Sequence, residues 1–307
     1  MYAKTKHIWM DGQIVPWENA KVHILTHSLH YGVGIFEGIR FYDCGGEPGI
    51  FRLKDHIQRF EESAKIVSIK LPFSKPDLEK ACVAMAHDSQ LKNGYIRPLL
   101  YIGEEPNAGL WAFDNQVHIS IIVYGWGAYL GEKGVSEGVR VKTSSYMRHH
   151  RNIAMTSAKI TGQYFNSVLA KREAVLSGFD EALMLDPEGY VAEGSGENIF
   201  AIKNGKIYTP LRASVLRGIT RETAMTLLKK EGLDVIETPL TRDDLYVADE
   251  VFFTGTAAEI TPVREIDHRQ IGSKAPGPIT RKLQSTYGNL VRGKLSEYES
   301  WITPVKK

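Results

Sequence analysis

Strand and helix patterns alternate along this chain without a simple βαβ rhythm, and several strand pairs are joined by hairpin turns. Asp11-Gly12 separates the apolar runs 8–10 and 14–15, and Asn204-Gly205 separates 199–202 from 207–208. Two-residue Asp-Gly and Asn-Gly loops are typical of β-hairpins. Gly45-Gly46 predicts a third hairpin. Together with the helical patterns elsewhere, these turns predict a mixed α/β (α+β) fold.

Alternation of apolar residues predicts further strands at 117–123 and 139–141. Apolar residues at helical spacing predict four helices, at 53–68, from 78 to near 94, at 159–176 and at 220–231. Gly178 and Gly232 follow the last two helices, where glycine commonly ends a helix.

The domain organisation is indicated by glycine content. Five glycines fall within residues 125–138. We predict a small N-terminal α/β domain at 1–125, a glycine-rich connector at 126–137 and a large C-terminal domain at 138–307. A chain of 307 residues has room for roughly two domains. Clefts between domains are common ligand sites.

Composition excludes several classes of function. The chain has 38 basic and 36 acidic residues, so its charge gives no reason to expect a nucleic-acid or membrane partner. The most apolar stretch, 117–124, is too short to span a bilayer, and the first eight residues lack the apolar core of a signal peptide. With only two cysteines, the chain is expected in the reducing cytoplasm.

The histidines and the short basic run are interpreted as structural. The run 148–151, Arg-His-His-Arg, lacks the wider basic surface that nucleic-acid binding needs. His27 and His30 do not have the spacing of a zinc site, and we expect no bound metal.

Lys159 is the first candidate for chemistry, because it is the only charged residue from Asn152 to Ala170. Most lysines are solvated surface groups, but those usually lie among other charges. An amine in apolar surroundings loses its proton more readily, and a neutral amine is what Schiff-base chemistry requires.

Three glycine-containing segments are further candidates. In 193–200, Glu193 precedes Gly-Ser-Gly and a strand, which fits either a solvated turn or a carboxylate aimed inward at a flat ligand. Segment 216–220 opens a predicted helix, and 254–258 holds small and hydroxyl residues after a strand. Either could present backbone N–H groups to a phosphate, although such sequences are also common as helix caps. Neither matches the P-loop or the dinucleotide fingerprint.

Taken together, these segments resemble the fold-type IV pyridoxal-phosphate (PLP) enzymes, and among them the bacterial branched-chain amino-acid aminotransferases. The matching segments are 157–159 (Ser-Ala-Lys), 193–198, 218–221 and 255–259, with 31–40, 95–98 and 126–129 agreeing in the N-terminal half and the interdomain loop. The resemblance covers nearly the whole chain.

This resemblance implies how PLP would be held. Lys159 would be the catalytic residue and form the internal aldimine. Glu193 would pair with the pyridine nitrogen, and Tyr164 would hydrogen-bond the ring oxygen. The phosphate would be held by Arg59, Ile219, Thr220 and Thr256.

The resemblance also implies a substrate pocket. Tyr95 and the backbone of Ala257 and Ala258 would receive the α-carboxylate, and Arg97 would engage the side-chain carboxylate of glutamate. The other pocket residues would be Tyr31, Phe36, Arg40, Trp126 and Tyr129, with Tyr164 also lining it. As single residues, such aromatics are more often part of a core.

The resemblance implies transamination between branched-chain L-amino acids (Leu, Ile, Val) and 2-oxoglutarate. It also implies a homodimer as the minimum assembly, with a hexamer (trimer of dimers) as the larger alternative. Tyr31 and part of the 103–113 loop would reach the neighbouring subunit's site. That loop departs from the version expected in enteric enzymes. A D-amino-acid aminotransferase and an aminodeoxychorismate lyase remain alternatives within the family, and a binding module without turnover is the alternative outside it.

Overall fold

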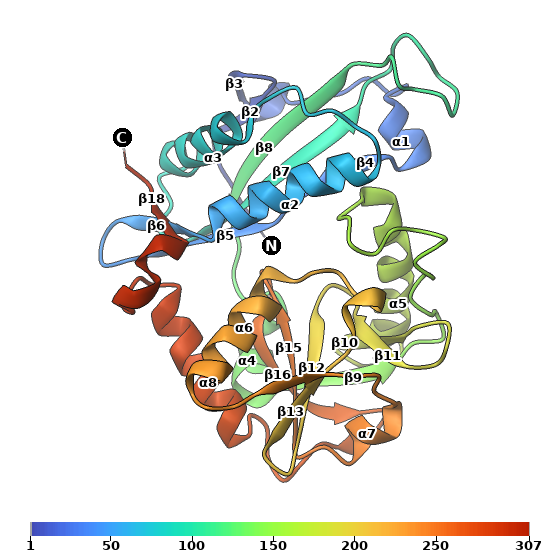
Figure 1. Cartoon of the computed structure of the whole chain (residues 1–307). Coiled ribbons are helices and arrows are strands. Elements are labelled where there is room, and N and C mark those ends of the chain that lie inside the picture. The colour runs from blue at the N-terminus through green and yellow to red at the C-terminus, as the bar shows by residue number, and fades with distance from the viewer. Residues whose placement is uncertain (1, 307) are drawn as a thin grey trace. The chain divides into compact units, whose positions relative to one another are not determined.

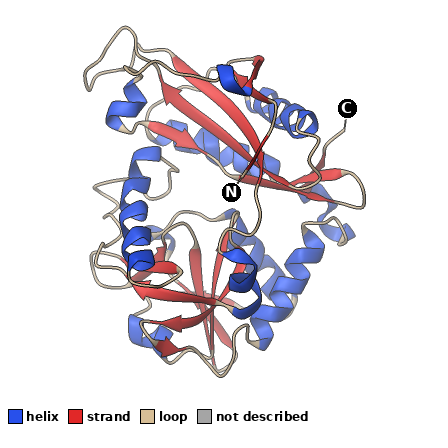
Figure 2. Cartoon of the chain, turned by 180° about the vertical axis from the view of Figure 1, so that it is seen from behind, coloured by secondary structure: helices blue, strands red, loops and turns tan. Residues whose placement is uncertain are grey.

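The computed structural model describes residues 2–306 and shows a mixed α/β structure (Figure 1). The chain forms two compact units. Unit 1 contains the described residues through Gly127, the segment Ala158–Gln163, and the described residues from Asn289 onward. Unit 2 contains Ala128–Ser157 and Tyr164–Gly288. The predicted fold class is confirmed, and in Figure 2 helices (blue) flank the strands (red) of each unit.

Unit 1 is built on an antiparallel sheet. Over residues 2–306 its nine strands follow the order β18-β6-β5-β7-β8-β2-β3, with β1 beside β8 and β4 beside β7. The strands are β1 (Ala3–Lys4), β2 (His7–Met10), β3 (Gln13–Pro16), β4 (Gly34–Phe36), β5 (Ile39–Asp43), β6 (Pro48–Phe51), β7 (Gly94–Ile102), β8 (Val117–Gly125) and β18 (Ile302–Pro304).

Helices α2 (Leu53–Ile66) and α3 (Lys75–Asp88) pack against the sheet of unit 1 (Figure 1). In α2 the residues Leu53, Ile57, Phe60 and Ala64 recur at helical spacing and are at most 1% exposed. Burial of this stripe explains why the segment is helical. The remaining helices of this unit are α1 (His27–Tyr31) and the 3-10 turns η1 (Trp17–Asn19), η2 (Thr161–Gln163) and η4 (Ser296–Trp301).

Unit 2 contains a mixed sheet. Over the described residues its nine strands follow the order β11-β10-β9-β16-β15-β12-β13-β14, with β17 beside β16. The strands are β9 (Val139–Thr143), β10 (Glu181–Leu185), β11 (Val191–Gly194), β12 (Asn198–Lys203), β13 (Lys206–Thr209), β14 (Val235–Glu237), β15 (Glu250–Gly255), β16 (Glu259–Ile266) and β17 (Arg269–Gln270). β9 is parallel to β10 and β16, and β13 to β14.

The helical elements of unit 2 surround this sheet. They are α4 (Gly131–Glu137), α5 (Tyr164–Leu176), η3 (Arg212–Ser214), α6 (Ile219–Lys230), α7 (Arg242–Tyr246) and α8 (Pro278–Leu290), whose last residues belong to unit 1. The core between helices and sheet is apolar, with Val141, Leu183, Ile199 and Phe253 fully buried or nearly so.

Most predicted elements are confirmed. The three hairpins form as β2–β3, β5–β6 and β12–β13, and the strands at β8 and β9 are present. Helices α2 and α6 lie within two residues of their predicted bounds. The second predicted helix begins earlier, at Lys75 behind the capping residue Ser74, and ends at Asp88 rather than near Gly94.

The prediction of a helix from Lys159 is wrong. Helix α5 begins at Tyr164, and Lys159 lies in an irregular segment before it. The reason is tertiary, because the backbone of this segment is paired elsewhere. Ile160 forms an isolated antiparallel bridge with Ile35.

The two units follow the chain differently from the predicted domain boundaries. Segment 158–163 packs in unit 1 through the bridge to Ile35, and the C-terminal end does so because β18 pairs with β6. The predicted connector at 126–137 contains helix α4, and unit 2 already begins at Ala128.

Candidate active site

Lys159 is held by its backbone in unit 1. Its N–H donates to the Ser63 hydroxyl (3.1 Å), and its carbonyl accepts from the N–H of Phe36 (3.1 Å). The amine lies 4.8 Å from the centre of the Phe36 ring. The neighbours Ala158 and Ile160 are buried. The backbone of Lys159 is therefore fixed in unit 1, and its amine lies beside an aromatic ring.

Arg59 lies on α2 in a buried charged cluster. Its Nε and Nη2 donate to the two carboxylate oxygens of Glu37, at 2.6 and 2.9 Å. His56, on the same helix, places its Nδ1 2.7 Å from Glu37 Oε2. Glu37 and His56 are almost completely buried, and Arg59 is 8% exposed. The guanidinium proposed to bind phosphate is thus oriented by a carboxylate that sequence reasoning did not single out.

The predicted substrate residues Phe36, Tyr95 and Arg97 come together in unit 1. The Arg97 guanidinium lies 4.9 Å from the Phe36 ring centre and 5.4 Å from that of Tyr95. Tyr95 also meets Trp126 edge to face, with ring centres 4.9 Å apart. The group combines apolar surfaces with one cation, since a guanidinium stacks readily on aromatic faces.

Two other residues complete this surface. Arg40 pairs with Tyr95 across β5 and β7, and its Nη2 donates to the Gly127 carbonyl (2.8 Å). A Cβ on Gly38 would lie only 1.8 Å from the Tyr95 hydroxyl, so any side chain there would force the Tyr95 ring to move. Gly38 was not among the predicted site residues, but it fixes the place of one of them.

Tyr31 lies apart from this group, on α1. It is 43% exposed, and its hydroxyl donates to the Ala108 carbonyl (3.2 Å) in the loop after β7. Tyr31 and the 103–113 loop therefore contact each other. They are the two segments that the resemblance assigns to the neighbouring subunit's site.

Glu193, on β11 of unit 2, is buried among donors. Arg148 Nε lies 2.7 Å from Glu193 Oε1 as an ion pair. The Asn198 amide and the Leu216 backbone N–H donate to Oε2, at 3.1 and 3.2 Å. These contacts fix the carboxylate's orientation, and a cation beside it favours its ionised form.

The two candidate phosphate segments are both turns of unit 2. Ile219 and Thr220 are the first residues of α6, and no side chain caps this helix at Gly218. The first N–H groups of a helix lack intrahelical acceptors and attract anions. Thr256, Ala257 and Ala258 form the turn between β15 and β16.

Tyr164 and Tyr129, the remaining predicted residues, also belong to unit 2. Tyr164 is half-buried at the first position of α5. Tyr129 lies beside Lys171, whose amine is 5.4 Å from the ring centre and 2.6 Å from Glu181 Oε2.

Glu197 is a buried carboxyl group close to Glu181. Burial, and then the nearby Glu181 carboxylate, raise the pKa of Glu197 to about 8.

The basic run at 148–151 was interpreted as structural, and Arg148 is in fact a buried residue. It forms an ion pair with Glu193, one of the candidate site residues. Burial and the Arg148 charge lower the pKa of His149 to about 4. Nothing in the local sequence indicates the Arg148–Glu193 pair, because its members lie on segments distant along the chain.

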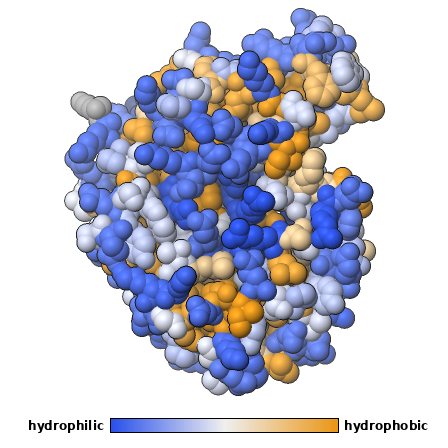
Figure 3. Space-filling model, viewed as in Figure 1, coloured by the Kyte–Doolittle hydropathy of each residue, from blue (hydrophilic) through white to orange (hydrophobic). Residues whose placement is uncertain are grey.

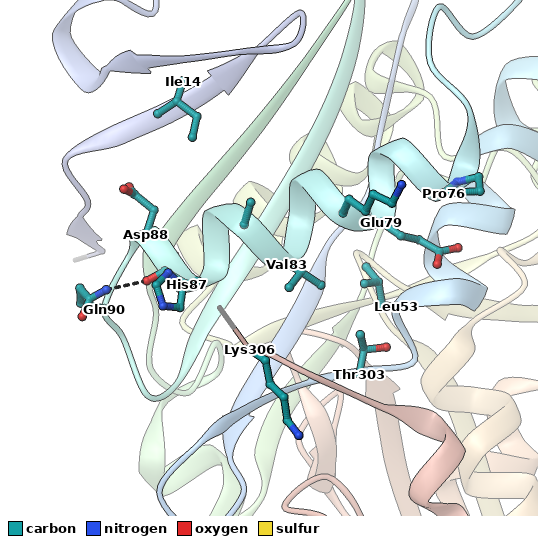
Figure 4. Close-up of a pocket in the computed structure, with 12 residues that line it drawn as sticks. Ile14, Leu53, Pro76, Glu79, Val83, His87, Asp88, Gln90, Thr303 and Lys306 are labelled. Atoms are coloured by element: carbon teal, nitrogen blue, oxygen red, sulfur yellow. Dashed lines mark hydrogen bonds between the residues drawn. The ribbon is translucent and has the colours of Figure 1, made fainter.

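One hollow on unit 1 is lined by none of the predicted site residues. A hollow of about 750 Å³ runs along α3 and is lined by Ile14, Val83, His87 and Lys306, among others (Figure 4). Within residues 2–306 no group of His, Cys, Asp or Glu is arranged to hold a metal ion. Over the same residues no helix is both long and apolar enough to cross a membrane.

Residues 34–266 match the model of the amino-transferase class IV family. The chain belongs to this family. Among its members, the branched-chain-amino-acid aminotransferase of Pseudomonas aeruginosa is 51% identical over 299 residues, covering 97% of each chain. The enzyme of the same name from Escherichia coli K12 is 40% identical, covering 99% of each.

Solved structures agree along nearly the whole chain. The crystal structure of the E. coli branched-chain amino acid aminotransferase matches with a TM-score of 0.96 at 40% identity, covering 99% of this chain and 100% of that one. A second enzyme of this name, from T.th. and solved with pyridoxamine 5'-phosphate, matches with a TM-score of 0.96 at 46% identity and the same coverage. The fold-type IV assignment is confirmed.

Proposed function

We propose that this class IV aminotransferase is a PLP-dependent branched-chain amino-acid aminotransferase. It transfers the amino group of leucine, isoleucine or valine to 2-oxoglutarate, giving branched-chain 2-oxo acids and L-glutamate. Relatives that carry this name share up to about half of their residues with this chain over nearly its full length.

The observation that carries the substrate assignment is the position of Arg97. Its guanidinium lies over the Phe36 and Tyr95 rings, so one surface offers both aromatic faces and a cation. A leucine side chain can rest on the rings, and a glutamate side chain can pair with the guanidinium. This explains how one pocket accepts both partners of the reaction.

The donor set of the chain fits PLP. Lys159 supplies an amine for the aldehyde, and Glu193 supplies an ionised carboxylate for the ring nitrogen. Arg59, with the turns at Ile219, Thr220 and Thr256, supplies a guanidinium and backbone donors for the phosphate, and Tyr164 supplies a hydroxyl for the ring oxygen. When bound, PLP contributes a ring that accepts electrons from the substrate's α-carbon.

The chain's own residues do the remaining work. The Lys159 amine takes the α-proton of the amino acid and returns a proton, as general base and then general acid. Glu193, held by Arg148, keeps a proton on the ring nitrogen by its negative charge. Tyr95 and the backbone of Ala257 and Ala258 bind the α-carboxylate, and Trp126 and Tyr129 shield the reacting atoms from water.

A homodimer is the minimum assembly that we propose, with a trimer of dimers as the larger form. Its support is the apolar surface at the end of unit 1, where Leu29, Leu110, Trp111 and Phe113 are 60–84% exposed (Figure 3). Exposed apolar patches of this kind mark interfaces. In a dimer, Tyr31 and the 103–113 loop serve the partner's site. Light scattering of the purified protein tests the assembly.

The predicted cytoplasmic location rests on the cysteines. Cys44 and Cys82 are both free thiols, and Cys82 is buried. Free thiols persist most readily in a reducing compartment.

Arg97→Ala tests the substrate assignment. We expect kcat/KM for glutamate to fall about 100-fold and that for leucine to fall less than about 10-fold, because only glutamate loses a charge-assisted fork. Arg97→Lys, which keeps the charge, is the matched control and should lie between wild type and alanine. Steady-state kinetics with both amino acids give the ratio, and equal losses for the two substrates contradict the assignment.

A further inference from the structure

A carboxylate with no assigned role lies at the centre of the charged cluster in unit 1. Glu37 directly follows β4 and is 0% exposed. Each of its oxygens is engaged: Oε1 by Arg59 Nε, and Oε2 by Arg59 Nη2, by His56 and by the N–H of Gly38. The two Arg59 contacts form a bidentate pair, the arrangement that fixes a guanidinium plane most firmly.

Stability alone does not explain this cluster. Taking two charges out of water costs about as much as their attraction returns, so a buried ion pair is weak evidence of a stabilising role. Burial opposes ionisation of Glu37, but the charge and hydrogen bonds of Arg59 and His56 outweigh it and hold the pKa of Glu37 well below its usual range. Glu37 is therefore an anionic partner of Arg59 near neutral pH.

The cluster shares its framework with the proposed catalytic lysine. Phe36, one residue before Glu37, donates its backbone N–H to the Lys159 carbonyl. Ser63, one helical turn after Arg59 on α2, accepts the Lys159 N–H. Residues three and four apart on a helix share a face, so His56, Arg59 and Ser63 face the same strand end.

We propose that Glu37 is a positioning residue, which sets the direction of the Arg59 guanidinium so that it receives the phosphate of PLP. This inference rests on the proposed function, because Arg59 acts on a phosphate only if the protein binds PLP. Glu37 itself touches no substrate. Without the Glu37 carboxylate, the Arg59 side chain would adopt several rotamers. Phosphate binding would then be weakened by the conformational entropy lost when this side chain is ordered.

A purely structural role for Glu37 makes a different prediction. If the pair only supports α2, its loss weakens every ligand of the site equally. If Glu37 aims Arg59, its loss weakens ligands that carry the phosphate and spares those that lack it. Pyridoxal, which is PLP without the phosphate, separates the two cases.

The experiment measures the affinity of the apo-protein for PLP and for pyridoxal by absorbance titration, in wild type and in Glu37→Gln. We expect PLP affinity to fall about 10–100-fold, the range by which metal affinity falls when a hydrogen-bond partner of a metal ligand is lost. Pyridoxal affinity should change less than about threefold. Arg59→Gln should abolish the same preference for PLP. The double variant should lose no more than Arg59→Gln alone, because both changes remove one interaction.

Two further variants guard against misfolding. Glu37→Asp keeps the charge but is one methylene shorter, so it should fold and lose part of the PLP preference. Glu250→Gln is the matched control: Glu250 is a buried carboxylate that accepts from the Ile279 and Thr280 N–H groups, outside the proposed site. It should lower the melting temperature of the apo-protein and leave the PLP-to-pyridoxal ratio unchanged.

Equal losses for PLP and pyridoxal in both Glu37 variants, or an unchanged PLP affinity, overturn the positioning role. A wild-type protein that binds neither compound overturns the proposed function instead. If the wild type prefers PLP over pyridoxal and Arg59→Gln keeps the same preference, Arg59 does not bind the phosphate. The proposed role of Glu37 is then wrong as well.

Discussion

The two units each contain a buried glutamate–arginine pair, and the proposed roles within the pairs are reversed. In unit 1 Glu37 holds Arg59, and we propose that the arginine is the member that faces the ligand. In unit 2 Arg148 holds Glu193, and we propose that the glutamate is the member that faces the ligand. A buried ion pair adds little to stability, but it fixes the direction of whichever member acts on the ligand. The same kind of ion pair would thus orient an arginine that binds an anion in unit 1 and a carboxylate that binds a cation in unit 2.

Replacing Glu193 should give the largest separation between the pairs. In Glu193→Gln, kcat should fall about 10²–10³-fold, as expected when one preorganised electrostatic partner of a transition state is lost. The preference for PLP over pyridoxal should stay as in wild type, since Glu193 does not act on the phosphate. The test measures kcat and the affinities for PLP and pyridoxal. If Glu193→Gln loses the preference for PLP over pyridoxal, the two pairs do not have the separate roles that we propose.

A smaller effect is expected from Arg148, because we propose that it acts only through Glu193. Arg148→Gln should lower kcat about 10-fold, within the range seen when an outer partner of a ligand is removed. A PLP analogue with carbon in place of the ring nitrogen makes the readout specific. The wild type should bind PLP more tightly than this analogue. In Arg148→Gln the ratio of the two affinities should be smaller.

The control for Arg148 is Arg140→Gln, because Arg140 also pairs with a glutamate of unit 2, Glu265, but on β9 outside the proposed site. This variant should keep the wild-type discrimination between PLP and the analogue. If both arginine variants narrow the difference equally, the effect comes from general destabilisation, and Arg148 has no role through Glu193.

The smallest predicted effect concerns Glu197, whose environment is the opposite of that of Glu37. Its neighbour is the carboxylate Glu181 rather than an arginine partner, and burial and this neighbour raise its pKa to about 8. Unfolded, it ionises near pH 4.5; folded, it keeps its proton to about pH 8. The folded state therefore binds more protons, and its stability falls as pH rises between these values.

Glu197→Gln removes this dependence. The stability of the variant relative to wild type should rise between pH 5 and 8, by at most about 1.4 kcal/mol per pH unit, in denaturant unfolding. Glu173→Gln is the control. Although burial opposes it, hydrogen bonds from Ser144 and Ser145 lower the pKa of Glu173 to about 2, so its difference should stay flat over this range. A flat difference for Glu197→Gln would show that this carboxyl ionises normally.

Local signals predicted much of the fold. The Asp11-Gly12 and Asn204-Gly205 hairpins and the apolar stripe of α2 each depend on a few neighbouring residues, and all three were confirmed. The helix predicted from Lys159 failed because its first residues pair with Ile35, Phe36 and Ser63, which are distant in sequence.

The candidate site shows the same limit. Lys159 is visible in the sequence as a single charge in an apolar stretch, and Glu193 is visible through its glycines. Glu37 and Arg148 are not, because their importance lies in partners that only the fold brings close. Long-range pairing is information that residue spacing does not contain.

The most direct measurement is an absorbance titration of the PLP-loaded protein with L-leucine, L-glutamate and D-alanine, added separately. We predict that both L-amino acids remove the absorbance band of the Lys159-bound cofactor, that 2-oxoglutarate restores it, and that D-alanine leaves it unchanged. Lys159→Ala should lack the band and the turnover. Loss of the band with D-alanine alone would place the enzyme among the D-specific members of the family, and full turnover by Lys159→Ala would contradict the account.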